Sequence, residues 1–293
     1  MKLSALFADG KFVISGEVGP PKGTDTHEVI AGAKVMAPYV DVVNVTDNQS
    51  AVMRLGSLIV SHLLKKEGIE PVFQLVCRDR NRIALQSDLL SAAAAGIENV
   101  LALTGDHMVL GDHPEAKPVF DLDSVQLLKA AQALNEGHDL EGHEVEGTPD
   151  LCLGAVVNPG SDEVDTQLVK MKKKIDAGAE FFQTQAVYEP EVFARFMERA
   201  AKLGAPVMVG IVPLKSAGMA RYMTENVAGV RVPDEMIERL KQTPKGERKK
   251  LSAEMSVELV TKMKGMCQGV HLMPLGWDDL VPDIVKGAGL NHA

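Results

Sequence analysis

The stretch Ala95-Gly-Ile-Glu-Asn-Val-Leu-Ala-Leu-Thr-Gly-Asp106 contains the pattern on which the fold prediction rests. Gly96 is suited to ending a helix, because glycine readily adopts the left-handed conformation that closes many helices. The apolar run at 100–103 is typical of a short buried strand, and the polar residues Thr104-Gly105-Asp106 follow it directly. A second copy of the arrangement, Ala177-Gly-Ala-Glu180, precedes the run at 181–185. The repetition predicts helix–strand units with polar residues at the strand ends.

Extending this pattern along the chain predicts eight strands, at 12–18, 40–45, 72–76, 100–103, 153–157, 181–185, 207–212 and 269–273. Helical patterns lie between them at 57–66, 82–95, 124–135, 163–177, 189–203 and 256–267. Regular alternation of this kind favours a parallel sheet. Eight units in 293 residues fit one closed (β/α)8 TIM barrel domain spanning 1–293. An open doubly wound sheet is the alternative, but the G-x-G-x-x-G motif expected after its first strand is missing.

The composition narrows the classes of partner and the compartment. A net charge of −9 and an aromatic content of 4% argue against nucleic-acid binding. No apolar run approaches the roughly 20 residues of a membrane helix, so no membrane partner is expected. Cys77, Cys152 and Cys267 are far apart and form neither a disulfide framework nor a zinc or iron–sulfur motif. A reducing cytoplasmic location is therefore expected.

Glu17 lies in the apolar segment Phe12-Val-Ile-Ser-Gly-Glu-Val-Gly-Pro-Pro-Lys22. Burying a charged carboxylate is costly, so such a group usually pairs with a partner or lies in a pocket that favours its acid form. The Gly-Pro-Pro that follows ends the strand, because proline has no N–H for the sheet. Glu17 is therefore expected at the C-terminal end of the first strand. A strand-end carboxylate that faces solvent is an equally weighted alternative.

In a barrel the C-terminal strand ends converge and carry the chemistry. The polar residues at these ends are Glu17, Thr46, Asp47, Asn48, Gln74, Arg78, Thr104, Gly105, Asp106, Asn158, Gln183, Thr184, Gln185 and Lys215. So many amides and hydroxyls suit a planar heterocycle such as a pterin or flavin, although any single amide is equally well explained as a strand cap. The ends hold no Ser/His/Asp set and no histidine cluster, so no metal is predicted there.

Two insertions depart from the simple repeat. The long segment 107–122 follows the fourth strand, and we expect it to be a functional loop on the catalytic face. The glycine-rich segment 136–149 is expected on the opposite face. Its His138 and His143 would suit a metal, but a solvated loop is the preferred interpretation.

Six motifs resemble methylenetetrahydrofolate reductase, in order over about 12–273. They are Glu17-Val-Gly-Pro-Pro-Lys22, Leu103-Thr-Gly-Asp106, Lys172-Lys-Lys-Ile-Asp-Ala-Gly-Ala179, Gln183-Thr-Gln185, Gly210-Ile-Val-Pro213 and Val270-His-Leu272. The segment 276–286, which begins Gly-Trp-Asp-Asp, is similar to a short bacterial branch found in acetogens.

The resemblance implies a flavin-bearing barrel that reduces 5,10-methylenetetrahydrofolate to 5-methyltetrahydrofolate. Glu17 would be the general acid that protonates folate N10, which opens the ring to an iminium that accepts hydride from flavin N5. Asp106 would stabilise that cation, Gln185 would bind the pterin edge, and Ala217 would pack near the substrate. The flavin contacts implied by the resemblance are Thr46, Gln74, Thr104, Gly105, Asp106, Asn158 and Lys174.

The chain departs from the family pattern at Gln74, Thr104 and Asn158, where the family commonly has His, Arg and Tyr. FAD is the expected cofactor, and FMN is the alternative. Some distant relatives work without a bound flavin. The electron donor would be NADH or reduced ferredoxin, acting directly or through an iron–sulfur partner subunit as in that branch. The sequence leaves open whether the chain forms a homo-oligomer. Alternatives are a methyltetrahydrofolate-binding methyltransferase barrel and a non-catalytic barrel subunit. Bound flavin, visible in an absorption spectrum, separates the first alternative from the reductase.

Overall fold

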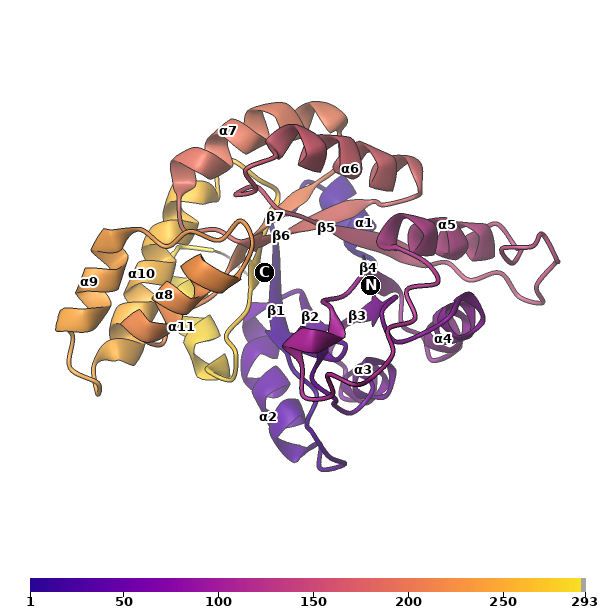
Figure 1. Ribbon diagram of the computed structural model, residues 1–293, viewed down its shortest axis with the longest axis horizontal. Coiled ribbons are helices and arrows are strands. Elements are labelled where there is room, and N and C mark those ends of the chain that lie inside the picture. The colour runs from indigo at the N-terminus through magenta and orange to yellow at the C-terminus, as the bar shows by residue number, and fades with distance from the viewer. Residues whose placement is uncertain (291–293) are drawn as a thin grey trace.

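The computed structural model describes residues 1–290, and these form a closed barrel of eight parallel strands in sequence order (Figure 1). The strands are β1 (Val13–Val18), β2 (Val42–Val45), β3 (Pro71–Val76), β4 (Asn99–Leu103), β5 (Cys152–Val157), β6 (Phe181–Ala186), β7 (Val207–Ile211) and β8 (Gly269–Leu272). Strand β8 pairs with β1, which closes the sheet. The predicted (β/α)8 barrel and all eight predicted strands are confirmed.

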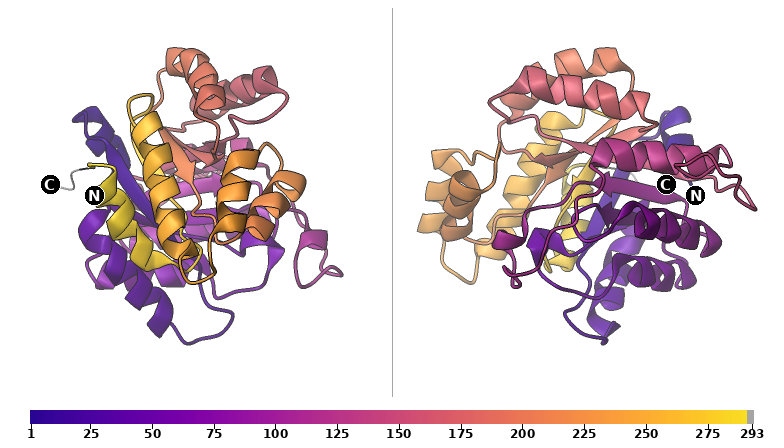
Figure 2. Two further views of the ribbon diagram at one scale, coloured as in Figure 1. Left: turned by 90° about the vertical axis from the view of Figure 1, so that its left-hand side faces the viewer. Right: turned by 45° about the vertical axis from the view of Figure 1, so that its right-hand side comes forward.

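Helices form a ring around the barrel (Figure 2). They are α1 (Leu3–Ala8), α2 (His27–Met36), α3 (Ser57–Lys66), α4 (Arg82–Ala94), α5 (Ser124–Asn135), α6 (Val164–Asp176), α7 (Pro190–Ala200), α8 (Ala217–Asn226), α9 (Asp234–Gln242), α10 (Arg248–Met263) and α11 (Val281–Gly287). The helical patterns named from the sequence do not include α1, α2, α8, α9 and α11. The sequence prediction also began α10 at 256 rather than at Arg248, because the polar first turn of that helix looks like a solvated link.

Alternation along the strands separates the inside of the barrel from the helix-facing side. The lowest inward layer is apolar and is formed by Val13, Val42, Val72, Leu101, Cys152, Phe181 and Met208. Helix α1 closes this N-terminal end, since Leu3 is fully buried in the same cluster and the Phe7 ring lies 6.3 Å from that of Phe181. The N-terminal end of the barrel is therefore a packed core.

The next inward layer is polar although each of its residues is at most 3% exposed. Asn44 and Gln183 exchange two amide hydrogen bonds, of 2.8 and 3.1 Å. Ser15 Oγ lies 2.8 Å from His271 Nδ1 on the neighbouring strand. Because these side chains satisfy one another, the layer can stay buried without a large desolvation penalty. It forms the floor of the C-terminal mouth.

The long loop 107–122 packs on the mouth side of the barrel, as predicted. Its 3₁₀ turn Met108–Leu110 contacts the turn Gln49–Ala51 that follows β2. Gly111 lies so close that a Cβ there would be 1.8 Å from the Ala51 carbonyl oxygen. Asp112 also accepts a hydrogen bond of 3.0 Å from Met53 N. The loops after β2 and β4 are thus one packed unit.

The loop at 136–149 lies at the other end, beside residues that precede β4. His143 pairs with Asp139 at 3.0 Å, and residues 1–290 contain no group of three side chains able to hold a metal ion. Within the same residues, no helix is both long and apolar enough to cross a membrane.

Candidate active site

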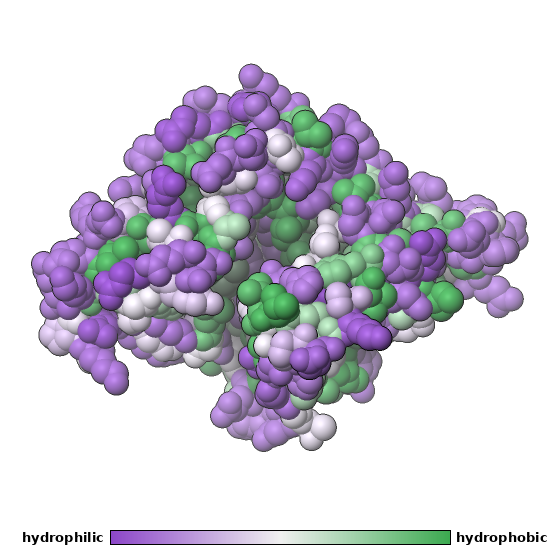
Figure 3. Space-filling view, viewed as in Figure 1, coloured by the Kyte–Doolittle hydropathy of each residue, from purple (hydrophilic) through white to green (hydrophobic). Residues whose placement is uncertain are grey.

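A cavity of about 660 Å³ lies at the C-terminal mouth, a size typical of small-molecule sites. Figure 3 shows the face of the molecule hollowed near its centre beside the loops after β2 and β4. The sequence-predicted residues that line the cavity are Glu17, Gln74, Thr104, Gly105, Asp106, Asn158, Lys174 and Gln185. Thr46 and Ala217 are buried outside this lining, Thr46 just after β2 and Ala217 at the start of α8.

Glu17 faces into the barrel and its residue is only 8% exposed. Its Oε2 accepts a hydrogen bond of 3.0 Å from Gln74 Nε2 and lies 3.3 Å from His271 Nε2. The alternation of β1 explains this placement, because Val13, Ser15 and Glu17 lie on successive inward positions. The solvent-facing alternative for Glu17 is therefore wrong. A buried carboxyl group with two polar neighbours is suited to holding and releasing a proton.

His271 was not identified as a site residue from the sequence, although it lies in the Val-His-Leu motif. It is buried on β8 between Glu17 and Ser15, with one ring nitrogen facing each. If the Ser15 hydroxyl donates to Nδ1, the Nε2–H of a neutral ring can donate to the Glu17 carboxylate. The period-two alternation of β8 was the signal that could have found it, because it places His271 on the inward face.

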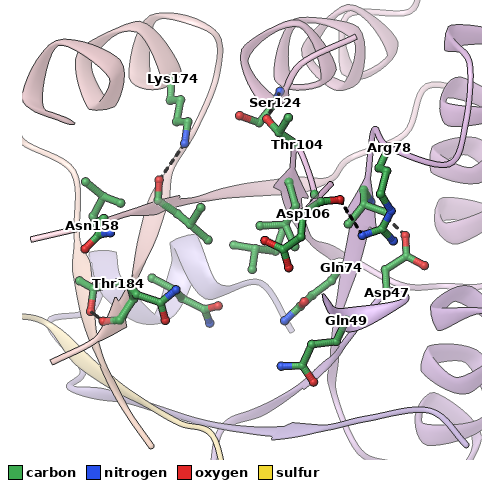
Figure 4. A pocket seen from close by; sticks show the side chains of 18 of the residues that line it. Asp47, Gln49, Gln74, Arg78, Thr104, Asp106, Ser124, Asn158, Lys174 and Thr184 are labelled. Atoms are coloured by element: carbon green, nitrogen blue, oxygen red, sulfur yellow. Dashed lines mark hydrogen bonds between the residues drawn. The ribbon is translucent and has the colours of Figure 1, made fainter. Parts of the chain in front are cut away.

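Asp106 follows β4 and lines the same cavity, on the side of Thr104 and Arg78 and across from Asn158 (Figure 4). It is exposed at the mouth, and its carboxylate has no hydrogen-bond or ion-pair partner among residues 1–290. The preceding Gly105 has a φ of +93°, a conformation that favours glycine. The two acidic side chains therefore differ in environment, because Glu17 is enclosed and hydrogen-bonded whereas Asp106 is open to a ligand.

Arg78 was noted at a strand end but was given no role from the sequence. Its guanidinium is bidentate to Asp79, with distances of 2.8 and 2.9 Å. Burial acts to raise the pKa of Asp79, but hydrogen bonds from Arg78 and Asn48 outweigh it and hold that pKa below its ordinary value. The same guanidinium donates to the carbonyl oxygens of Asp106 and Asn48.

Helix α6 contributes a basic wall formed by Lys170, Lys173 and Lys174. Lys174 Nζ donates to the Val156 carbonyl at 2.8 Å, and burial, together with the charge of Lys170, lowers its pKa to about 8. In the part of the chain that the structure describes, none of the three has a carboxylate within ion-pairing distance. Asn158 lies beside this wall, and its buried Oδ1 has no hydrogen-bond partner among the same residues. The wall can therefore receive an anionic group.

Comparison with known proteins gives the family. The family model for methylenetetrahydrofolate reductase matches residues 2–289. The chain belongs to this family. The 5,10-methylenetetrahydrofolate reductase of Pectobacterium carotovorum is 26% identical over 263 residues, which cover 86% of this chain and 81% of that protein. Methylenetetrahydrofolate reductase 2 of Schizosaccharomyces pombe is also 26% identical, over 80% of this chain.

The chain spans only part of some relatives. The match covers 38% of the S. pombe protein and 34% of a probable methylenetetrahydrofolate reductase (NADPH) from Caenorhabditis elegans. Among solved structures, a protein from Clostridium thermocellum described as binding two copies of 5-methyl-5,6,7,8-tetrahydrofolic acid superposes with a TM-score of 0.69. That superposition covers 99% of this chain and all of the other, at 16% identity, and it supports the barrel fold.

Proposed function

We propose that this member of the methylenetetrahydrofolate reductase family reduces 5,10-methylenetetrahydrofolate to 5-methyltetrahydrofolate, with Glu17 as the general acid. The observation that carries the proposal is the enclosed Glu17, hydrogen-bonded by Gln74 and adjacent to His271, on the same cavity as the unpaired carboxylate of Asp106. Reduction of this substrate passes through a cation, so it requires one acid that donates a proton and one that keeps its charge.

In this reaction Glu17 would donate its proton to N10 of the folate, which breaks the bond from N10 to the bridging carbon. His271 and Gln74 would hold the resulting carboxylate by hydrogen bonds. Asp106 would face the exocyclic iminium and lower the energy of its positive charge. Gln185 lines the same cavity, and we propose that it binds the pterin edge. Ala217 stays a proposed packing residue behind the site.

The residues present fit a flavin. Gln74 and Thr104 offer neutral polar groups, Gly105 leaves main chain uncovered by a side chain, and Asn158 Oδ1 is a buried acceptor without a partner among residues 1–290. The basic wall of α6 suits the phosphates of FAD, and FMN would use the same wall. A bound flavin would supply the hydride that reduces the iminium carbon. We also keep Thr46 and Asp106 as proposed flavin contacts.

The electron donor to the flavin would be external to the barrel. We propose NADH or reduced ferredoxin, delivered directly or through an iron–sulfur partner subunit, because the three cysteines are dispersed and buried. We further propose that residues 1–293 form a single barrel domain in the cytoplasm. A homo-oligomer is compatible with this arrangement.

Two measurements test the proposal. The first is reconstitution with FAD or FMN, followed by dialysis and fluorescence of the released flavin; a protein that retains neither would contradict the cofactor assignment. The second is stopped-flow measurement of Glu17→Gln. We expect flavin reduction by an artificial donor to be nearly unchanged, while folate reduction falls roughly 10²–10⁴-fold, as for the loss of a general acid. Folate reduction at the wild-type rate would refute the role of Glu17.

A methyltransferase barrel that binds methyltetrahydrofolate is the second candidate, since the structural neighbour from C. thermocellum is described as binding that folate. Such a protein would bind 5-methyltetrahydrofolate but retain no flavin. The same reconstitution therefore separates the two functions.

A further inference from the structure

Arg78 has a large and almost completely buried side chain, which links the loops after three neighbouring strands. It is 1% exposed and follows β3. Its Nη1 donates to the Asp106 carbonyl at 3.2 Å, and its Nη2 donates to the Asn48 carbonyl at 3.0 Å. Asp79, on its own loop, binds the other edge of the guanidinium. One side chain thus joins the loops that follow β2, β3 and β4.

The bond to the Asp106 carbonyl matters because it acts on the main chain that carries the Asp106 carboxylate. Among residues 1–290 it has no polar partner, so its direction depends on the main chain that carries it. That main chain is held by Arg78 at two points, because Arg78 N also donates to the Thr104 carbonyl at 3.1 Å. The left-handed Gly105 lies directly against Arg78, and a Cβ at Gly105 would be 3.0 Å from Arg78 Cβ.

The turn after β2 depends on the same guanidinium. Asn48 has a φ of +43°, which is a strained conformation for a residue with a side chain. Its carbonyl is bound by Arg78, and its Nδ2 donates to Asp79 Oδ2 at 3.0 Å. The Arg78–Asp79 pair therefore holds the loops after β2 and β4 at the cavity mouth, with a planar donor set that a lysine cannot reproduce.

We propose that Arg78 is a positioning residue that sets the direction in which the Asp106 carboxylate enters the cavity. This inference rests on the proposed function, in which Asp106 faces a developing cation. Asp79 balances the charge of Arg78, so the effect of Arg78 on the reaction is transmitted through the geometry of Asp106. Misplacement of a reacting group by about 1 Å costs on the order of a hundredfold in rate.

The test is a double-mutant cycle on the flavin-loaded protein, with Arg78→Lys, Asp106→Asn and the combination. We expect Arg78→Lys to lower kcat/KM for folate reduction by roughly 10–100-fold. In the Asp106→Asn background the same change should cost less than about threefold, because the group that it positions is already impaired. Flavin reduction by an artificial donor should differ by less than about twofold between Arg78→Lys and the wild type, and between the double variant and Asp106→Asn, since Arg78 acts only through the folate half-reaction.

Arg80→Lys is the matched control. Arg80 is partly buried and ion-paired with Asp47 and Asp88, but it makes no bond to the Asp106 segment. We expect it to lower the melting temperature comparably while leaving kcat/KM within about threefold of the wild type. Asp79→Asn supplies a second route if Arg78→Lys fails to fold. It should lower kcat/KM for folate reduction in the same way as Arg78→Lys but by less, because it removes only the ion pair that holds the Arg78 guanidinium.

The outcomes separate the two hypotheses. A wild-type protein that reduces no folate with either flavin overturns both the proposed function and the role of Arg78. An active wild type in which Arg78→Lys, or Asp79→Asn in its place, costs equally in both backgrounds overturns the Arg78 inference alone. Equal losses in Arg80→Lys and Arg78→Lys would likewise show that Arg78 is only structural.

Discussion

We expect the buried ammonium of Lys174 to lower the free energy of unfolding while it strengthens the proposed flavin binding, and its pKa gives the size of the first effect. Burial and the neighbouring Lys170 lower that pKa from 10.5 to about 8. Each pH unit between the folded and unfolded values corresponds to about 1.4 kcal/mol, so the buried charge costs on the order of 3 kcal/mol at neutral pH. Lys174→Met removes this cost together with a hydrogen bond to Val156 worth about 1 kcal/mol. The variant should therefore be about 2 kcal/mol more stable at pH 7.

The pH dependence distinguishes this cause from better packing of methionine. Between about pH 8 and 10.5 the unfolded state holds the Lys174 proton more tightly than the folded state. The cost is therefore fully present below pH 8 and disappears as the pH rises towards 10.5. We expect the advantage of Lys174→Met to be largest at pH 7 and to shrink steadily by pH 9.5. Urea denaturation at several pH values measures it.

Flavin binding should change in the opposite direction. Loss of a charge-assisted contact to a phosphate weakens binding by about 1.5–3 kcal/mol, which is roughly a 10–100-fold increase in Kd. Lys172→Met is the matched control, because Lys172 is exposed on the same helix and pairs with Asp176. It should change stability by less than about 0.5 kcal/mol at any pH. A Lys174→Met protein that is less stable than the wild type at pH 7, or whose advantage does not vary with pH, refutes this reasoning.

Three further predictions concern the floor of the cavity and the loop after β4. His271→Asn removes a polar contact to Glu17 that contributes about 1 kcal/mol. We therefore expect kcat/KM for folate reduction to fall roughly fivefold, with flavin reduction unchanged. An unchanged folate rate would show that this contact does not matter for the reaction. Gly105→Ala should cost about 1–3 kcal/mol in urea denaturation because of its φ of +93°, whereas Gly246→Ala, with open space around it, should be nearly neutral; equal effects would argue against strain. Gln183→Leu leaves the Asn44 amide unpaired and should lower the free energy of unfolding by about 1–3 kcal/mol. Adding Asn44→Leu should recover part of this loss. A double variant whose loss equals the sum of the two single losses would contradict the prediction.

Much of the barrel could be predicted from the sequence because buried strands are short apolar runs with clear ends. Helices were less visible where their buried face is made of small residues. On α2 the inward residues include Gly32 and Ala33, and a Cβ at Gly32 would be 2.1 Å from the Asp278 carboxylate. Close packing there requires the lack of a side chain, which removes the apolar signal. The first turn of α10 was missed because exposed lysines occur equally in helices and loops.

Residues that line the cavity could be predicted from the sequence where they lie at the end of a strand. Glu17 and Gln185 were found in this way, and the structure places both on the cavity. Arg78 received no role because its hydrogen bonds join three loops that are distant in the chain, and such contacts have no sequence period. The flavin role of Thr46 and the packing role of Ala217 came from the family resemblance, and both roles stay predictions, since the structure buries both residues outside the cavity lining.

Helix α1 has a consequence for the order of folding. Leu3 precedes every strand in the chain, yet it is buried in one cluster with side chains from β1 through β7, including Met208. Contacts separated by some two hundred residues form slowly, because the intervening chain must first be ordered. The helix therefore has no complete binding surface until β7 is in place. Until the residues of β7 have been synthesised, the apolar face of α1 lacks part of its partners, and transiently exposed apolar surface of this kind is what chaperones bind.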